Sequence, residues 1–128
     1  MTGLTLDTGA LIAYERRDRR VSVLLDEAID ADTPITVPAG VLAQAIRDPA
    51  RQARTSKLVR QAHTRVSPLD HGAAIQVGRL LAASRTSDVV DAQVVLCARK
   101  TDDTIVTSDP RDLKRLDPGA QLFVLGEV

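Results

Sequence analysis

Aspartates stand shortly after two of the apolar runs in this sequence. Asp7 directly follows Leu4–Leu6, and Asp109 comes two residues after Thr104–Thr107. If both runs are parallel strands, their carboxyl ends meet at one edge of a sheet, which is where ligand sites form in such sheets. The sequence therefore predicts that Asp7 and Asp109 converge on one cleft.

A second pair of carboxylates stands at the start of a predicted helix. Asp91 belongs to the stretch 89–99, which is apolar on almost every face and should be buried. Asp88, three residues earlier, faces the same side of this helix start. A buried carboxylate must be paired, hydrogen-bonded or metal-bound, yet the nearest basic residues in the sequence, Arg85 and Arg99, lie well away along the chain.

Four carboxylates in one notch would repel one another unless a cation lay among them. With one cysteine and no plausible histidine ligand, the oxygen donors favour Mg²⁺ or Mn²⁺ over zinc. A carboxylate site of this kind suits phosphodiester hydrolysis, because the metal activates water and neutralises charge on the phosphate.

A simpler interpretation is that these aspartates only cap helices. Asp109 is followed by a proline and then by Asp112, an acid at the third helical position, and Asp88 and Asp91 have the same spacing. Asp7 could likewise cap a helix that begins at Thr8. Taken singly, each aspartate is explained by capping, so this alternative stays open.

The amino-acid composition excludes several classes of fold and binding site. The 128 residues have 17 basic and 17 acidic side chains and are 44% hydrophobic, which predicts a single folded domain over 1–128. Aromatic residues make up only 2%, which excludes a base-stacking platform. The single Cys97 excludes an intramolecular disulfide and a multi-cysteine zinc site. No apolar run is long enough to span a membrane and no signal peptide is evident, so we expect a cytoplasmic protein.

The chain alternates short β-rich runs with longer helical stretches. We expect strands at 4–6, 34–38, around 66, 104–107 and 122–125. We expect helices from Thr8 onward, at 21–29, 39–46, 51–62, from the capping Asp70 to about 83, 89–99 and 110–116. This alternation predicts an α/β fold with a mainly parallel sheet.

Basic residues recur before the middle of the chain. We expect Asp48 to cap one helix that presents a winding stripe of basic residues, namely Arg51, Arg54, Lys57 and Arg60. The stripe could follow an RNA phosphate backbone, or it could be a solvated face or a surface for an acidic partner. Arg111 and Lys114, close to Asp109, could contact a scissile phosphate or be solvated. We expect His63 and His71 at the surface and Cys97 in the core.

Four segments of the sequence resemble one known family. They are 6–13 (LDTGALIA), 37–43 (VPAGVLA), 88–92 (DVVDA) and 106–113 (VTSDPRDL). In this order and spacing they resemble the PIN-domain family, and in particular the VapC-type ribonuclease toxins of toxin–antitoxin pairs. The resemblance runs from Leu4 to about Val124.

The resemblance implies a small three-layer α/β/α domain that cleaves RNA with Mg²⁺ or Mn²⁺ and leaves a 5′-phosphate and a 3′-hydroxyl. It also implies a homodimer and a cognate antitoxin whose tail covers the active site. The family's acidic set corresponds to Asp7, Asp91 and Asp109, with Asp112 as an accessory.

One position departs from the family pattern. Gln44 stands where the family usually has a glutamate, and an amide adds no negative charge. We expect Asp88 to supply the missing carboxylate, while Gln44 orients a water or a carboxylate. The alternatives are weakened metal binding, or a catalytically silent PIN module that binds RNA or a partner protein.

Overall fold

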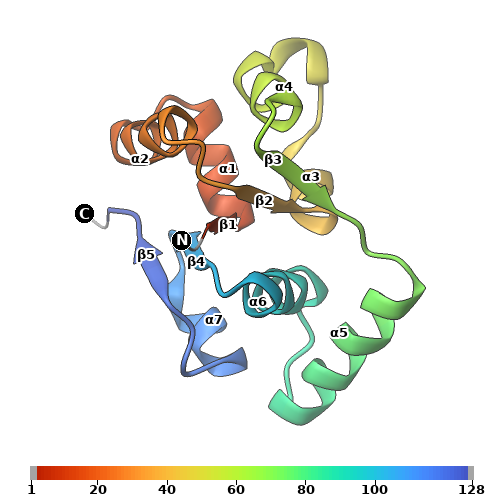
Figure 1. Ribbon diagram of the computed structural model, residues 1–128. Coiled ribbons are helices and arrows are strands. Elements are labelled where there is room, and N and C mark those ends of the chain that lie inside the picture. The colour runs from red at the N-terminus through yellow and green to blue at the C-terminus, as the bar shows by residue number, and fades with distance from the viewer. Residues whose placement is uncertain (1–2, 127–128) are drawn as a thin grey trace.

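A five-stranded parallel sheet forms the centre of the structure, a computed structural model that describes residues 3–126 (Figure 1). The ends of the expected domain, residues 1–2 and 127–128, lie outside this range. The strands are β1 (Leu4–Leu6), β2 (Ile35–Pro38), β3 (Thr64–Ser67), β4 (Thr104–Thr107) and β5 (Leu122–Val124). Their spatial order is β3-β2-β1-β4-β5, with every neighbouring pair parallel.

Seven α-helices and a short 3-10 helix connect the strands. They are α1 (Thr8–Glu15), α2 (Arg19–Asp30), α3 (Ala39–Ala45), η1 (Pro49–Arg51), α4 (Ala53–Arg60), α5 (His71–Ser84), α6 (Val89–Thr101) and α7 (Pro110–Leu116). Figure 1 shows α1, α2 and α4 on one side of the sheet and α5, α6 and α7 on the other. The three-layer α/β/α architecture is therefore confirmed. Among the described residues, no helix combines the length and hydropathy needed to cross a membrane.

Strand β1 lies at the centre of the sheet, where the order of strands along the chain reverses. Leu4 of β1 is opposite Ile35 of β2 on one side and Thr104 of β4 on the other. From β1 the chain builds outward through β2 and β3, then returns through α5 and α6 to add β4 and β5 on the other side. In open parallel sheets, the crevice at such a reversal is the usual ligand site. Asp7 and Asp109 flank this crevice.

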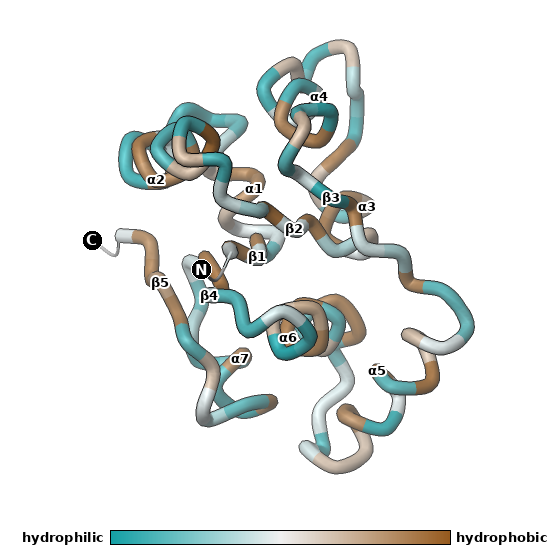
Figure 2. The backbone as a smooth tube through the Cα atoms, viewed as in Figure 1, coloured by the Kyte–Doolittle hydropathy of each residue, from teal (hydrophilic) through white to brown (hydrophobic). Residues whose placement is uncertain are grey.

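The core is aliphatic, and α6 contributes much of it. Ala92, Val94, Val95 and Ala98 of this helix are buried. Figure 2 shows that α6 is hydrophobic over most of its length, whereas α2 and α4 alternate between hydrophobic and hydrophilic residues. Because α6 leads into β4, it must begin at the carboxyl edge of the sheet. The predicted burial of α6 is confirmed, and it places the start of the helix beside the crevice.

The basic segment departs from the predicted single helix over 51–62. The structure has a 3-10 turn at Pro49–Arg51, and α4 begins only at Ala53. The Asp48 side chain makes no capping bond. Instead, the Gln52 amide binds three backbone groups: its oxygen accepts from the N–H of Arg47 and of Asp48, and its nitrogen donates to the Ala45 carbonyl. These bonds fix a break in the chain that the sequence pattern did not reveal.

Other boundaries differ by a few residues. The helix predicted over 21–29 begins at Arg19, because Asp18 accepts a capping bond from the Val21 N–H. The helix predicted over 89–99 extends to Thr101. The strand element predicted near 66 covers Thr64–Ser67.

A buried glutamine connects three elements around the crevice. Gln93 of α6 is only 2% exposed. Its side-chain oxygen accepts from the Gly40 N–H at 2.9 Å, and its nitrogen donates to the Ser67 carbonyl at 3.1 Å. The first bond caps α3, whose own N-cap residue, Pro38, supplies no side-chain hydrogen bond. Gln93 thereby joins α6 to the start of α3 and the end of β3.

We expect Gln93→Leu to lower the free energy of unfolding by about 1 kcal/mol, because it leaves the partly buried Gly40 N–H and Ser67 carbonyl without these partners. Urea denaturation monitored by circular dichroism measures this change. The matched control is Gln76→Leu on the exposed face of α5. Equal stability of the two variants would show that the Gln93 bridge does not stabilise the fold.

Candidate active site

Asp7 is a buried carboxylate at the carboxyl end of β1, only 7% exposed. Its Oδ1 accepts from the Ala10 N–H at 2.8 Å and so caps α1. Burial raises the pKa of Asp7 above its ordinary value, and the nearby Asp109 raises it further, while hydrogen bonds from Thr107, Ala10 and Gly9 oppose the shift. Asp7 therefore caps a helix and also faces a second carboxylate.

Asp109 does not act as a helix cap. It precedes α7, but its side chain makes no capping hydrogen bond, and its backbone N–H donates to the Thr107 hydroxyl at 2.9 Å. The simpler interpretation of this aspartate, as a cap with proline behind it, is not what the structure shows. Its exposed carboxylate remains available to a ligand.

Gly9 lets the end of β4 approach the start of α1. A side chain at this position would collide with the Ser108 hydroxyl. The start of α1 and the turn that carries Asp109 therefore pack directly against each other at Gly9 and Ser108. The glycine of the LDTG segment, residues 6–9, marks this contact in the sequence, but a search for carboxylates alone does not consider it.

Asp91 is half-buried in the first turn of α6, and Asp88 caps that helix by accepting from the Asp91 N–H at 2.9 Å. Burial, the largest cause, and four surrounding carboxylates raise the pKa of Asp91 to about 6; in order of effect the four are Asp88, Asp112, Asp7 and Asp109. Each of the other four predicted acidic residues thus acts on Asp91. The order also shows that Asp88 and Asp112 influence Asp91 most.

Three of these carboxylates line a cavity of about 310 Å³ between the loop after α5, the start of α6 and α7. They are Asp88, Asp91 and Asp112, and we call this cavity the acidic notch. Asp7 and Asp109 are not among its lining residues. The acidic set therefore extends from the notch to the crevice between β1 and β4.

The carboxylate oxygens suit a hard cation, but the side chains are not arranged around a single metal position. Within residues 3–126, no three His, Cys, Asp or Glu side chains come close enough together to form a ready-made metal centre. Because like charges repel, closer approach of these carboxylates is unfavourable unless a cation lies among them. Their oxygen chemistry and shared excess of negative charge fit Mg²⁺ or Mn²⁺.

Gln44 lies on α3 and is engaged with the segment that follows Asp7. Its side-chain oxygen accepts from the Thr8 hydroxyl at 2.6 Å. The residue in the position of the expected glutamate therefore reaches the edge of the crevice. Its carbonyl oxygen is already bonded to another side chain.

The basic residues predicted to bind RNA do not form one track. Arg54 lies over the Tyr14 ring at 4.2 Å and donates to the Tyr14 carbonyl and the Ser22 hydroxyl, so its guanidinium holds α4 against α1 and α2. Arg51 lies on the separate 3-10 turn, 3.5 Å from Asp48. Lys57 is exposed on α4.

The two basic residues predicted near Asp109 also differ from each other. Lys114 donates to the Pro118 and Ala120 carbonyls and closes the turn after α7. Arg111 is exposed on the first turn of α7. Of this pair, Arg111 is the side chain that no described hydrogen bond engages.

Two arginines not predicted for the site do line the acidic notch. Arg85 follows α5 and Arg115 lies on the last turn of α7, and both border the cavity together with Asp88, Asp91 and Asp112. Arg115 stands three residues after Asp112, a spacing that places both on one side of a helix. Arg85 stands three residues before Asp88 in the short segment between α5 and α6, so it too lies close to a notch carboxylate along the chain.

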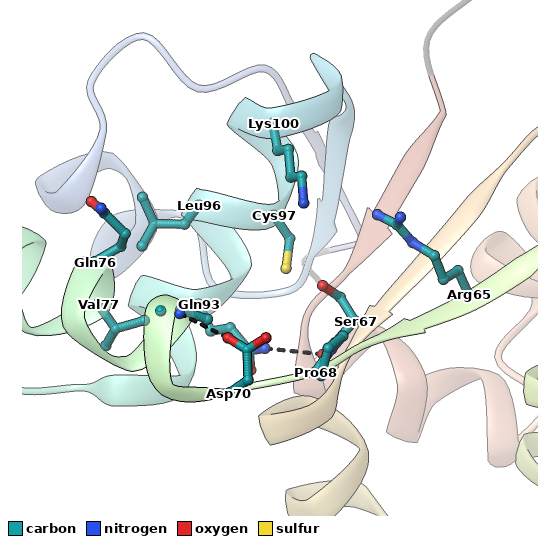
Figure 3. A pocket seen from close by; sticks show the side chains of 12 residues that line it. Arg65, Ser67, Pro68, Asp70, Gln76, Val77, Gln93, Leu96, Cys97 and Lys100 are labelled. Atoms are coloured by element: carbon teal, nitrogen blue, oxygen red, sulfur yellow. Dashed lines mark hydrogen bonds between the residues drawn. The ribbon is translucent and has the colours of Figure 1, made fainter.

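A larger cavity of about 350 Å³ lies elsewhere, between β3, α5 and α6 (Figure 3). Its lining includes Cys97, which was predicted to be a core residue but is only partly buried. Its one acidic lining residue, Asp70, caps α5 by accepting from the Ala73 N–H. This cavity therefore lacks the set of oxygen donors found around the notch. His63 and His71 are exposed, as predicted.

Comparison with known proteins identifies a family. The family model of the PIN domain matches residues 4–118. Among curated proteins, none matches the sequence.

Solved structures share the fold. A chain in the crystal structure of VapBC2 from Rickettsia felis, bound to a DNA fragment from its promoter, has a TM-score of 0.71 at 15% identity, covering 96% of this chain and 98% of that chain. A chain of FitAcB from Neisseria gonorrhoeae has a TM-score of 0.64 at 18% identity, covering 94% and 96%. At these identities, the similarity establishes the fold.

The pKa of Asp91 predicts how the stability of the protein depends on pH. Between about pH 4 and 6 the folded protein binds more protons at this site than the unfolded chain, so its stability should fall as the pH rises through this window. In EDTA at pH 7.5 we expect Asp91→Asn to be of order 1 kcal/mol more stable than the wild type, a modest gain because solvent screens a half-exposed carboxylate. Denaturant titrations at several pH values measure it.

The control is Asp30→Asn, an exposed carboxylate at the end of α2, which should leave the pH dependence unchanged. Adding Mn²⁺ should stabilise the wild type more than Asp91→Asn. A wild-type stability that rises between pH 4 and 6 relative to Asp91→Asn would contradict the described electrostatics.

Proposed function

The chain belongs to the PIN-domain family, and on this premise we propose that it is a metal-dependent endoribonuclease, the toxin of a type II toxin–antitoxin pair. Nuclease activity is the general function of PIN domains, and PIN nucleases generally use divalent metal ions. The proposed reaction is hydrolysis of an RNA phosphodiester bond to a 5′-phosphate and a 3′-hydroxyl. We further propose that residues 1–128 form one such domain.

The observation that carries this proposal is the environment of Asp91. Burial, as the largest cause, and four other carboxylates at the carboxyl edge of the sheet raise the pKa of Asp91 to about 6. Such an arrangement stores repulsion that a divalent cation would relieve.

In the proposed site, Asp7, Asp91 and Asp109 would hold Mg²⁺ or Mn²⁺, with Asp88 and Asp112 in support. The bound ion would supply an activated water and offset the charge of the phosphate. Asp7 is the most rigid of these ligands, because the Ala10 N–H and the surrounding core fix it. Gln44 would orient a water or a neighbouring carboxylate, and Arg111 and Lys57 remain candidates for RNA contact.

The partner in this proposal is an antitoxin protein. Two neighbours by fold, VapBC2 and FitAcB, come from toxin–antitoxin complexes. An apolar groove of about 470 Å³ between α3 and α4, with Leu42, Ile46 and Val59 in its lining, offers a surface for apolar side chains of such a partner. Leu42 and Ile46 lie on α3, the helix that also carries Gln44. We also propose a homodimer, as the resemblance implies.

A catalytically silent PIN module is the second candidate, and Gln44 favours it. Its neutral amide adds no charge, and its oxygen already accepts from the Thr8 hydroxyl. A protein of this kind would bind RNA or a partner protein without cleavage. Metal-dependent cleavage by the purified protein decides between the two candidates.

We expect Asp7→Asn to reduce Mn²⁺-dependent cleavage of RNA at least about 100-fold while the protein stays folded, because asparagine caps a helix as well as aspartate does. The assay uses purified protein, free of any antitoxin, with labelled RNA. Asp70→Asn is the matched control: Asp70 caps α5 as Asp7 caps α1, at 2.9 Å rather than 2.8 Å, but it is not one of the five carboxylates of the proposed site. Cleavage at the same background level by the wild type and Asp7→Asn would support the silent module.

We expect Gln44→Glu to bind Mn²⁺ roughly tenfold more tightly, because it adds a carboxylate where the family has one. Isothermal titration calorimetry measures the affinity, with Gln76→Glu on α5 as the control for added charge alone. If both variants bind Mn²⁺ like the wild type, position 44 does not belong to the metal site.

A further inference from the structure

The acidic notch has cationic walls as well as carboxylates. Arg85, in the loop after α5, and Arg115, on α7, line it from two sides of the segment that begins α6. Both side chains are exposed, so their guanidinium groups can contact a ligand in the cavity. A site for metal alone has no use for cations at its rim.

Neither arginine neutralises the carboxylates that share its cavity. Ion pairs among residues 3–126 join Arg51 to Asp48, His63 to Asp32 and Arg99 to Asp117. Arg85 and Arg115 are in none of them, although Asp88, Asp91 and Asp112 line the same 310 Å³. Neither guanidinium group therefore forms an ion pair within 4.0 Å with a carboxylate of the described residues, which leaves both groups free to bind an anion.

Arg85 also has an unfavourable backbone conformation. It ends α5 in the left-handed region, with φ 56° and ψ 41°, a position usually taken by glycine. Of the described non-glycine residues with positive φ, Asp32 and Asp102 are of a type that enters this region comparatively easily, whereas Arg17 and Arg85 are not. Arg85 alone among the four lines the notch. Arg85 therefore places a side chain at a backbone position that favours glycine.

From these observations we infer that Arg85 and Arg115 bind a phosphate of single-stranded RNA beside the carboxylates. The inference rests on the proposed function and assigns its substrate contacts. Guanidinium groups bind phosphate oxygens through paired, charge-assisted hydrogen bonds, which lysine cannot match in geometry. The carboxylates would bind the cation, and the arginines would bind the negatively charged phosphate of the substrate. The charges of the site and its ligands would then balance. The arginines position the phosphate and take part in no bond making.

Arg85→Gly tests this inference without endangering the fold, because glycine suits the left-handed conformation. Binding of a fluorescent single-stranded RNA is measured by anisotropy in EDTA, over a range of salt concentrations. We expect Arg85→Gly and Arg115→Gln each to weaken binding roughly three- to tenfold. Each should also lower the slope of log K against log salt concentration by about 0.7, the value for one lost phosphate contact on a single strand. A purely structural role would not change that slope.

Two controls separate conformation and charge from phosphate binding. Asp102→Gly makes the same backbone change at the end of α6, where Asp102 has φ 55°, and Arg79→Ala removes an exposed cation from α5. Both should bind RNA with wild-type affinity and slope. If Arg85→Gly and Arg115→Gln do so too while the wild type binds and cleaves RNA, the assignment of the arginines is wrong and the proposed function stands. If the wild type neither binds nor cleaves RNA, both fail.

Discussion

Repulsion among carboxylates at one edge of the sheet is the constraint on which the site depends. Asp91 is half-buried at the start of α6, a helix whose apolar residues are packed in the core. Its burial and the charges of Asp88, Asp112, Asp7 and Asp109 all oppose its ionisation. This repulsion is unfavourable, and the burial of aliphatic residues of the sheet and α6 offsets it. A protein without use for a cation would gain stability by replacing one of these aspartates with a neutral residue.

The carboxylates combine this electrostatic role with ordinary helix capping. Asp7 and Asp88 each accept a hydrogen bond from a backbone N–H three residues ahead, which both satisfies the helix start and fixes the carboxylate in place. Capping and ligand binding are therefore compatible at these positions, because a carboxylate has several lone pairs and a cap uses one. Asp109 differs, since its side chain does not cap α7.

The distribution of cations follows from tertiary packing rather than from spacing. Arg54 belongs by sequence to a basic stripe, yet it stacks on Tyr14 and ties three helices together. Lys114 closes a turn. Arg85 and Arg115, thirty positions apart along the chain, border one cavity instead. A long basic side chain can reach backbone carbonyls, rings or solvent, and only its neighbours decide which.

The sequence by itself determined the class of fold and the order of most elements, and it singled out the candidate acidic residues. These features are local patterns: alternating strands and helices, an apolar helix, and the position of Asp7 and Asp109 after strands. It also determined that Gln44 brings no charge. Only the tertiary structure decided that Asp112 acts on Asp91, that Gln93 joins α6 to α3, and which arginines reach the notch. These facts depend on contacts between distant segments and on the side chains that fill the space between them, and no local pattern encodes those contacts.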